Sequence, residues 1–464
     1  MNKKFRNLFK DTLLFALGSF GSKIILFFLV PLYTNFLTTE EYGIADLVFT
    51  TAQLVIPIVS LVIFEAVIRF GLMTDKDPAE VLKAGLIVGT AGAVLTVAVT
   101  PLFDLYTPIS PWKWYLCVYV ILNFGSTILK SYLKVKDRNK AFAIISIVQT
   151  LVLALFNILL LAVFHVGVRG YLIANIVAAA VSLVLAALSG DVIRDFLQAD
   201  LNRELLVEMV KYSAPLILND LSWWVIHSSD KYMVEAMVSA SALGIFTAST
   251  KIPALINVMI SIFGQAWNIS SIKEMDSTND TDFYSKVFEG YAFITFGACV
   301  ALTAIIKPFM DIYVGKSFQD AWMYVPLLLV SAVFSSISSY YGQMYAALKK
   351  TVNNMLTTLS AAVINIIVNY IFILSYGIWG AVIGTVVAYV FIAFARMLDV
   401  GRFIDIRIDL ARFFANCAII LTQGILVSMH YHITAVSILS IALFVVVNRD
   451  MISSILRAVL RRSK

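Results

Sequence analysis

Two stretches of the chain share one phrase: Pro101–Tyr106 reads PLFDLY, and Pro308–Tyr313 reads PFMDIY. Each copy ends an apolar segment, and each is followed shortly by Trp and Tyr residues. The phrase therefore indicates an internal repeat. In a membrane protein such a repeat is typical of transporters, because two similar halves can enclose a path between them.

The composition is that of a membrane protein. Of the 464 residues, 60% are hydrophobic and 14% are charged, whereas soluble domains carry about 25% charged residues. Segments of about 20 apolar residues can span a bilayer, and as helices they satisfy their own backbone hydrogen bonds. Fourteen such segments occur, near residues 11–37, 44–70, 82–104, 112–133, 141–164, 170–190, 212–236, 243–271, 287–311, 322–347, 354–375, 379–397, 412–429 and 432–448. The sequence predicts an all-α polytopic membrane protein.

Further matches extend the repeat along the chain. Gly43 recurs as Gly244, and the two glycines at 167 and 170 recur at 377 and 380. Six segments separate the equivalents, and six is even, so both copies keep one orientation about an axis along the membrane normal. We expect a first six-helix lobe (1–190), a cytoplasmic linker (191–211), a second six-helix lobe (212–400), and two added helices with a basic cytoplasmic tail (401–464).

The basic residues predict the orientation of the chain. Counting both termini and every second loop places 28 Lys and Arg residues on one side and four on the other. Basic loops stay in the cytoplasm, so both termini are expected there. The clearest marker is the stretch 130–140, taken as a loop, with five basic residues. The net charge of +6 is explained by this asymmetry, and we expect no nucleic-acid partner.

Neither metal chemistry nor catalysis is indicated. The three cysteines lie in apolar segments without metal-ligand spacing, so we expect neither disulfides nor a zinc site. No P-loop, dinucleotide fingerprint or catalytic triad occurs. We therefore expect no metal, no cofactor and no enzymatic activity.

Charged residues inside spanning helices cost about 2.5–3.5 kcal/mol each and are the first candidates for function. Lys23 lies near mid-depth in its segment, and Lys251 lies about 12 Å into its segment at 1.5 Å per residue. Both are too deep to reach the interface easily. The candidate binding residues are Lys23, Lys251, Lys231, Arg69, Gln53, Trp224, His227, Gln265 and Asn268, and the candidates for ion or proton coupling are Asp46, Glu65 and Asp220.

Polar stripes and prolines mark the same four segments, which are equivalent in pairs under the repeat. One stripe has a spacing of 4, 3, 4 and 3, and a second has a spacing of 4, 3 and 4, so each occupies one helical face. The first is Asp46, Thr50, Gln53, Pro57 and Ser60, and the second is Asp220, Trp224, His227 and Lys231. Proline bends helices, and the in-helix prolines are Pro31, Pro57, Pro215 and Pro253, with only Pro326 elsewhere.

Several of these residues also have ordinary structural explanations. Glu65 and Arg69 stand four residues apart and can neutralise each other. Asp230 and Lys231 are placed near the outer interface, where a lysine can extend to water. His227 can be a packing residue.

The N-terminal region resembles the start of the Wzx-type polysaccharide flippases. The resemblance rests on Gly18, Pro31 and the run Leu37–Gly43, LTTEEYG, and it continues through the fourteen segments and the six-plus-six repeat. These flippases belong to the MOP superfamily, with the MATE drug/cation antiporters and the lipid II flippase MurJ. The resemblance implies two lobes that alternate between inward- and outward-open states in the bacterial cytoplasmic membrane. It implies an undecaprenyl-pyrophosphate-linked oligosaccharide, such as an O-antigen or capsule repeat unit, as cargo.

The charges fit such a cargo, because pyrophosphate cannot cross hydrocarbon alone and lysine is an adequate point-charge partner for phosphate. Trp224 could stack on a sugar face. Three alternatives stay open. A MATE-type antiporter needs a cavity dominated by acids. A lipid II flippase needs the same basic residues as the polysaccharide flippase, because its cargo is also anionic. A membrane polysaccharide polymerase or ligase usually has a long external loop. Other polysaccharide-assembly proteins are further candidate partners.

Overall fold

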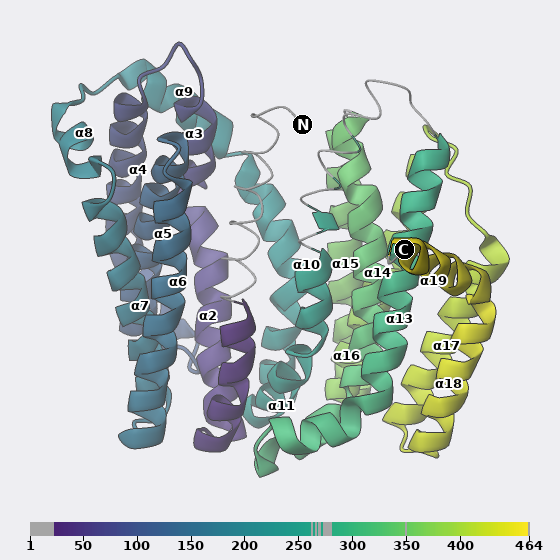
Figure 1. Cartoon of the computed structure of the whole chain (residues 1–464). Helices are drawn as coiled ribbons and strands as arrows, with labels where there is room; N and C mark the ends of the chain where they lie inside the picture. Colours follow the sequence, from purple (N-terminus) through teal and green to yellow (C-terminus); the bar gives the residue numbers. More distant parts are fainter. Residues whose placement is uncertain are drawn as a thin grey trace. The chain divides into compact units, whose positions relative to one another are not determined.

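The computed structural model describes residues 23–260, 263–264, 267, 271, 281–348 and 350–462, and these residues form helices and no strand (Figure 1). Ten of the described helices are long and apolar enough to cross a bilayer, and a bent pair, Ala240–Thr250 with Pro253–Ile260, could form an eleventh span. Two shorter apolar helices are Lys23–Phe36 and Ile433–Val447. The prediction of an all-α polytopic membrane protein is confirmed, and the count of fourteen stays a prediction.

The chain forms two compact units, Met1–Ser228 and Ser229–Lys464. In the first unit, α5 packs against α2, α3, α4 and α7, and α6 packs against α7. The helices after Lys23–Phe36 are α2 (Thr39–Ser60), α3 (Ile63–Gly71), α4 (Pro78–Val99), α5 (Lys113–Val135), α6 (Asn139–Asn157), α7 (Val168–Leu188), α8 (Val192–Gln198), α9 (Arg203–Ser213) and α10 (Leu216–Met237), which continues into the second unit.

The LTTEEYG run forms the start of α2. The Thr38 hydroxyl accepts a hydrogen bond from the backbone N–H of Glu41 at 3.2 Å, and the Glu41 carboxylate accepts one from the backbone N–H of Thr38 at 2.9 Å. This reciprocal cap satisfies two donors that a helix start otherwise leaves without partners. Tyr42 and Gly43 then lie in the core. The run is therefore explained by helix initiation.

The segment expected at 44–70 is two helices, because the chain breaks at Leu61 and Val62. Both residues have φ of 51°, a left-handed conformation that bulky side chains rarely adopt. Pro57, one turn earlier, has no N–H and already interrupts the hydrogen-bond ladder of α2. The break gives α3 its own direction, and α3 carries Glu65 and Arg69.

The polar stretch expected as a linker forms two short helices that pack on the first unit. α8 packs against α4 and α7, and α9 packs against α3 and α4, and Figure 1 shows both at the same end of the unit as α3. The Asp195 carboxylate accepts a hydrogen bond from the Tyr132 hydroxyl at 2.6 Å and pairs with Lys136 at 3.1 Å. Burial alone would raise the pKa of Asp195, but these two contacts outweigh it and hold the pKa below its usual value. The attachment is therefore charged at neutral pH and weakens only in acid.

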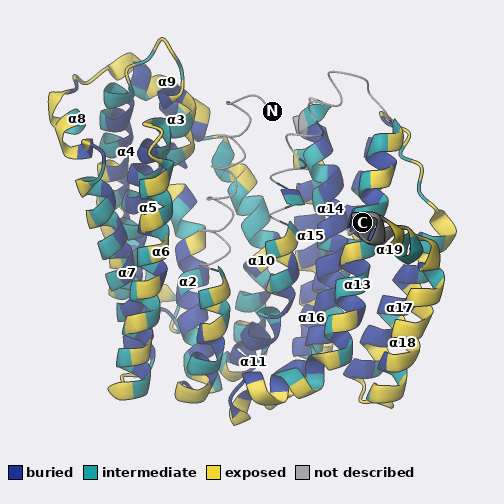
Figure 2. Ribbon diagram, in the orientation of Figure 1, coloured by how far each residue is buried: buried dark blue, intermediate teal, exposed yellow. Residues whose placement is uncertain are grey.

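The second unit is built around three helices, α14, α15 and α16, which pack closely together. α13 packs against α14, α17 and α18. Figure 2 shows many exposed residues along α17 and α18, and these include apolar side chains such as Ile438 and Val446. Such a surface suits lipid. The helices are α11 (Ala240–Thr250), Pro253–Ile260, α13 (Thr281–Tyr313), α14 (Val325–Ala347), α15 (Thr351–Tyr376), α16 (Ile378–Val400), α17 (Leu410–Ser428), α18 (Ile433–Val447) and α19 (Arg449–Arg462).

The expected proline pattern is wrong at two positions. Pro215 lies between α9 and α10 rather than inside a helix, since α10 begins at the residue after it. Pro308 lies inside α13, although it was assigned to the end of a segment. Pro57 lies inside α2, as expected. Pro253 starts the helix that follows the 46° bend after α11.

Gly92 allows α4 to approach α2 closely, so Gly92→Ala should destabilise the first unit. A Cβ at this position would lie 2.3 Å from the backbone oxygen of Val59, and relieving such a clash typically costs about 1–3 kcal/mol. The measurement is the melting temperature of the purified protein in detergent. Gly290→Ala is the control, because a Cβ there meets nothing within 4 Å and alanine favours a helix by about 0.5–1 kcal/mol. Equal melting temperatures for the two variants would contradict this packing.

Candidate functional site

Four of the predicted residues lie on α2 and α3: Asp46, Gln53, Glu65 and Arg69. Gln53, Glu65 and Arg69 have exposed side chains, although they belong to apolar segments. Asp46 is only 7% exposed and interacts electrostatically with the Tyr42 side chain. Of the polar stripe on α2, only Gln53 is exposed, and its other members are buried: Asp46, Thr50, Pro57 and Ser60. On α2 a polar ligand can therefore reach Gln53.

Glu65 and Arg69 stand four residues apart on α3. Within the described part of the chain no ion pair joins them, and the Arg69 guanidinium instead lies 5.4 Å from the ring centre of Tyr212 on α9. A cation over an aromatic face keeps its charge available to a further partner. Arg69 is an exposed positive charge on α3, and its mutual neutralisation with Glu65 stays an alternative explanation.

Trp224 connects α10 to α2 within the first unit. Its indole N–H donates a hydrogen bond to the backbone oxygen of Thr50 at 2.9 Å, and the side chain is half-buried. Trp223 stacks on His227, with ring centres 5.5 Å apart. Asp220, one turn before Trp224, is half-buried and accepts a hydrogen bond from Asn219 at 3.4 Å. His227 is therefore held by an aromatic neighbour, and Trp224 is held in a fixed orientation.

The three candidate lysines are half-buried, and each of them has interaction partners. Lys23 is the first described residue, and it lies on the helix Lys23–Phe36. Lys251 lies at the break between α11 and the helix Pro253–Ile260, so the expected continuous helix is interrupted at this lysine. Lys231 lies on α10. Gln265 and Asn268, also predicted to bind cargo, lie outside the described residues.

A buried polar network in the second unit was not recognised from the sequence. Asp230, which was placed near the outer interface, is only 4% exposed. One of its carboxylate oxygens accepts a hydrogen bond from the Thr385 hydroxyl on α16 at 3.2 Å. On α15, the Asn365 amide oxygen accepts hydrogen bonds from Ser229 at 3.0 Å and from Asn369 at 3.1 Å. The network therefore joins α10, α15 and α16.

Three atoms of this network have no hydrogen-bond partner among the described residues: Asp230 Oδ1, Asn369 Oδ1 and Asn365 Nδ2. Buried polar atoms normally have partners, so each exception calls for an explanation. A carboxylate and amide oxygens are the ligands of small hard cations, and a carboxylate can also take up a proton. The described residues contain no group of three or more His, Cys, Asp and Glu side chains that could hold a metal ion. The network therefore suits a proton or a single small cation.

Arg396 connects α14, α15 and α16. It is 1% exposed, and its guanidinium donates hydrogen bonds to the Ser338 backbone oxygen at 3.0 Å, to Asn354 at 2.6 Å and to Thr358 at 2.8 Å. Gly342 makes room for it, because a Cβ there would lie 2.3 Å from Arg396 Nη1. Neutral acceptors surround the charge on several sides. The arrangement is that of a structural cross-link.

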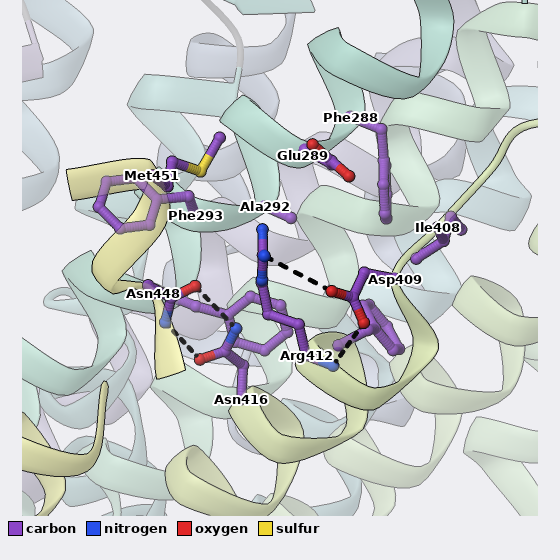
Figure 3. A pocket seen from close by; sticks show the side chains of 12 residues that line it. Phe288, Glu289, Ala292, Phe293, Ile408, Asp409, Arg412, Asn416, Asn448 and Met451 are labelled. Atoms are coloured by element: carbon purple, nitrogen blue, oxygen red, sulfur yellow. Dashed lines mark hydrogen bonds and ion pairs between the residues drawn. The ribbon is translucent and has the colours of Figure 1, made fainter. Parts of the chain in front are cut away.

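A small cavity lies between α13, α17 and α19 (Figure 3). Asn416 and Asn448 point toward one another and exchange hydrogen bonds of 3.3 and 2.9 Å. Arg412 pairs with Asp409 at 3.5 Å beside them. The cavity encloses about 30 Å³, which is room for about one water molecule. It is too small for an oligosaccharide and is excluded as the cargo site.

Comparison with known proteins assigns the chain to a protein family. A family described as polysaccharide biosynthesis protein matches residues 8–268, which is more than half of the chain. No curated protein matches the sequence.

Several solved structures share the fold. The chain is similar to the lipid II flippase MurJ in an inward closed conformation, with a TM-score of 0.72 and 14% identity over 95% of this chain and 100% of that chain. It is similar to a MATE multidrug resistance transporter of the MOP superfamily in the inward-facing conformation, with a TM-score of 0.62 and 15% identity over 82% and 98% of the two chains. The outward-facing form gives a TM-score of 0.58 and 17% identity over 84% and 94%. These likenesses establish the fold, as the sequence predicted.

Arg396→Met should destabilise the second unit by about 3 kcal/mol, because it removes the hydrogen bonds by which the buried guanidinium joins Ser338, Asn354 and Thr358. The control is Arg402→Met, which removes a side chain that is 76% exposed and pairs with Asp399 at 3.7 Å. An exposed pair contributes about 0–1 kcal/mol. Thermal unfolding in detergent measures both variants. A small and equal effect would mean that the Arg396 contacts do not hold the three helices together.

Proposed function

The chain belongs to the polysaccharide biosynthesis protein family, and from this premise we propose that it is a Wzx-type flippase. Its cargo would be an undecaprenyl-pyrophosphate-linked oligosaccharide repeat unit, moved from the cytoplasmic to the outer leaflet by alternating access. The family match carries the proposal, and the fold shared with transporters supports it. Both termini would lie in the cytoplasm, and the lobes would be 1–190 and 212–400.

The charges of the spanning helices favour an anionic cargo. Lys23 and Arg69 lie on apolar helices, and Lys251 lies at the break after α11. Within the described residues, the exposed Arg69 forms no ion pair with Glu65. A pyrophosphate would draw its stabilisation from such cations. Gln53 offers an amide to sugar hydroxyls, and Trp224 offers a fixed aromatic face. Gln265 and Asn268 stay candidates for sugar contacts by their place in the sequence.

The three alternatives differ in cargo and chemistry. A MATE-type drug/cation antiporter would bind cations and is disfavoured by these basic residues. A lipid II flippase would carry a related lipid-linked diphosphate, and only its cargo separates it from the proposed function. A polysaccharide polymerase or ligase would need a catalytic site, whereas the residues singled out here fit binding. A translocation assay with defined lipid-linked oligosaccharides tests all three.

Lys23→Ala and Lys251→Ala should each impair polysaccharide export while leaving the amount of protein in the membrane unchanged. Losing one charged contact to phosphate should weaken cargo binding by about 1.5–3 kcal/mol, or roughly 10- to 100-fold. Export is measured in cells that lack the native flippase. Lys140→Ala, which removes an exposed lysine, is the control. Full export by both variants would mean that the lysines are structural, and the basic-site mechanism would have to be given up.

The buried network around Asp230 supports a role in energy coupling. Asp46, Glu65 and Asp220 were the candidates by sequence, and Asp230 joins them because its second carboxylate oxygen is buried without a partner. Uptake of a proton or a small cation there would change the contacts among α10, α15 and α16. The network thereby links ion binding to the packing of three helices.

Asp230→Asn should uncouple export from its ion gradient while cargo binding persists. The amide keeps the shape of the side chain, but it cannot take up a proton and has no negative charge to attract a cation. The measurement is cargo translocation into vesicles under an imposed proton or sodium gradient. Asp220→Asn, on the same helix and only half-buried, is the matched variant. If Asp220→Asn loses gradient dependence and Asp230→Asn keeps it, the coupling group has been misassigned.

A further inference from the structure

The basic stretch 130–140 contains two kinds of positive charge. Lys136 pairs with Asp195 at 3.1 Å, and Arg138 pairs with Asp191 at 3.3 Å, so both are neutralised by acids at or within α8. Lys130 lies inside α5, which runs from Lys113 to Val135, and not in the loop where the sequence placed it. Lys134 also lies inside α5. These two lysines therefore belong to a spanning helix, and their charges need a different explanation.

Lys130 is held by a neutral partner. Its ammonium donates a hydrogen bond to the Gln149 amide oxygen on α6 at 3.2 Å, and the side chain is half-buried. An ammonium has three donors, so this one bond leaves two for other partners. No carboxylate within the described part of the chain forms an ion pair with Lys130. A half-buried charge with only an amide beside it is costly in a spanning helix.

Lys134 lies one helical turn after Lys130, on the same face of α5. Its ammonium lies 4.4 Å from the ring centre of Phe142. The charge of Glu65 acts on it from α3, but the described residues contain no ion pair between the two. Like charges four residues apart on a helix repel each other by a few tenths of a kcal/mol. The pair thus concentrates two positive charges that an anion would stabilise.

We propose that Lys130 and Lys134 form a subsite of the first unit that binds the diphosphate of the cargo. This inference rests on the proposed function, because that function supplies a ligand with two adjacent phosphates. The two lysines share one face of α5 and their charges act on each other, so together they can oppose the two adjacent charges of a diphosphate. Lysine binds phosphate as a point charge. Gln149 is a positioning residue, which orients the Lys130 ammonium without cancelling its charge. A phospholipid headgroup offers the same chemistry with one phosphate, and the experiment separates the two sources.

The test is a binding measurement on the purified full-length protein in detergent, with undecaprenyl diphosphate as one probe and phosphatidylglycerol as the other. Lys130→Gln and Lys134→Gln should each weaken binding of the diphosphate about 10-fold or more, and Lys130→Arg should retain most of the affinity. Lys140→Gln, at an exposed position outside α5, removes the same charge and should bind as the natural protein does.

Gln149→Glu separates an anion site from a merely structural contact. It gives Lys130 an internal carboxylate, so the melting temperature should stay the same or rise while the affinity for the diphosphate falls. A structural role for the Lys130–Gln149 contact would leave diphosphate binding unchanged in this variant.

The outcomes have distinct meanings. Equal diphosphate binding by the natural protein and the Lys130→Gln/Lys134→Gln double variant overturns the subsite and leaves the proposed function standing. If the double variant loses phosphatidylglycerol binding to the same extent as diphosphate binding, the subsite binds bilayer lipid, and its link to the cargo is overturned. Failure of the natural protein to bind the diphosphate at all overturns the proposed function, and the subsite with it.

Discussion

Lipid offers no hydrogen bonds, so a polar side chain on a spanning helix must find its partner within the protein or its ligand. Many of the described hydroxyl groups find their hydrogen-bond partner on the same helix. The Thr96 hydroxyl donates to the Gly92 backbone oxygen at 2.7 Å, one turn back on α4. Arg396 obeys it over a longer range, since its donors reach α14 and α15. Satisfied groups of this kind hold helices together and need no further function.

The same constraint separates residues that serve structure from residues that serve binding. Lys136 and Arg138 have carboxylates beside them and secure α8 to the first unit. Among the residues that the structure describes, Lys130 has an amide as its hydrogen-bond partner, and one carboxylate oxygen of Asp230 has no partner. The first pair is complete as it stands. Lys130 can still bind an anion, and Asp230 can still bind a proton or a cation. A coupled transporter of diphosphates would bind both kinds of charge.

The helical fold could be predicted because the apolar segments are long and the charges between them are few. The predictions that the structure corrected concern positions whose conformation or burial depends on tertiary contacts, which the sequence does not show. Leu61 and Val62 give no sign of a left-handed break, since neither residue favours that conformation. Depth along a segment placed Asp230 near the interface, whereas its burial comes from α15 and α16. The polar pair Asn365 and Asn369, four residues apart in an apolar helix, was the available signal. The partners of Trp224 and Lys130 lie 174 and 19 residues away.

The attachment of α8 and α9 has a consequence for dividing the molecule. The stretch 191–211 is the most polar one between the apolar segments. It is therefore the obvious place for limited proteolysis or for expressing the protein as two fragments. Yet most of it is helical, with α8 and α9 on either side of residues 199–202. Asp195 and Asp191 tie it to α5 and the residues just after α5, and the first unit continues to Ser228, inside α10. A cut near residue 200 would therefore leave the first fragment without α9 and without the indole that reaches Thr50. The place that is easiest to cut is not a place where two self-sufficient fragments would result.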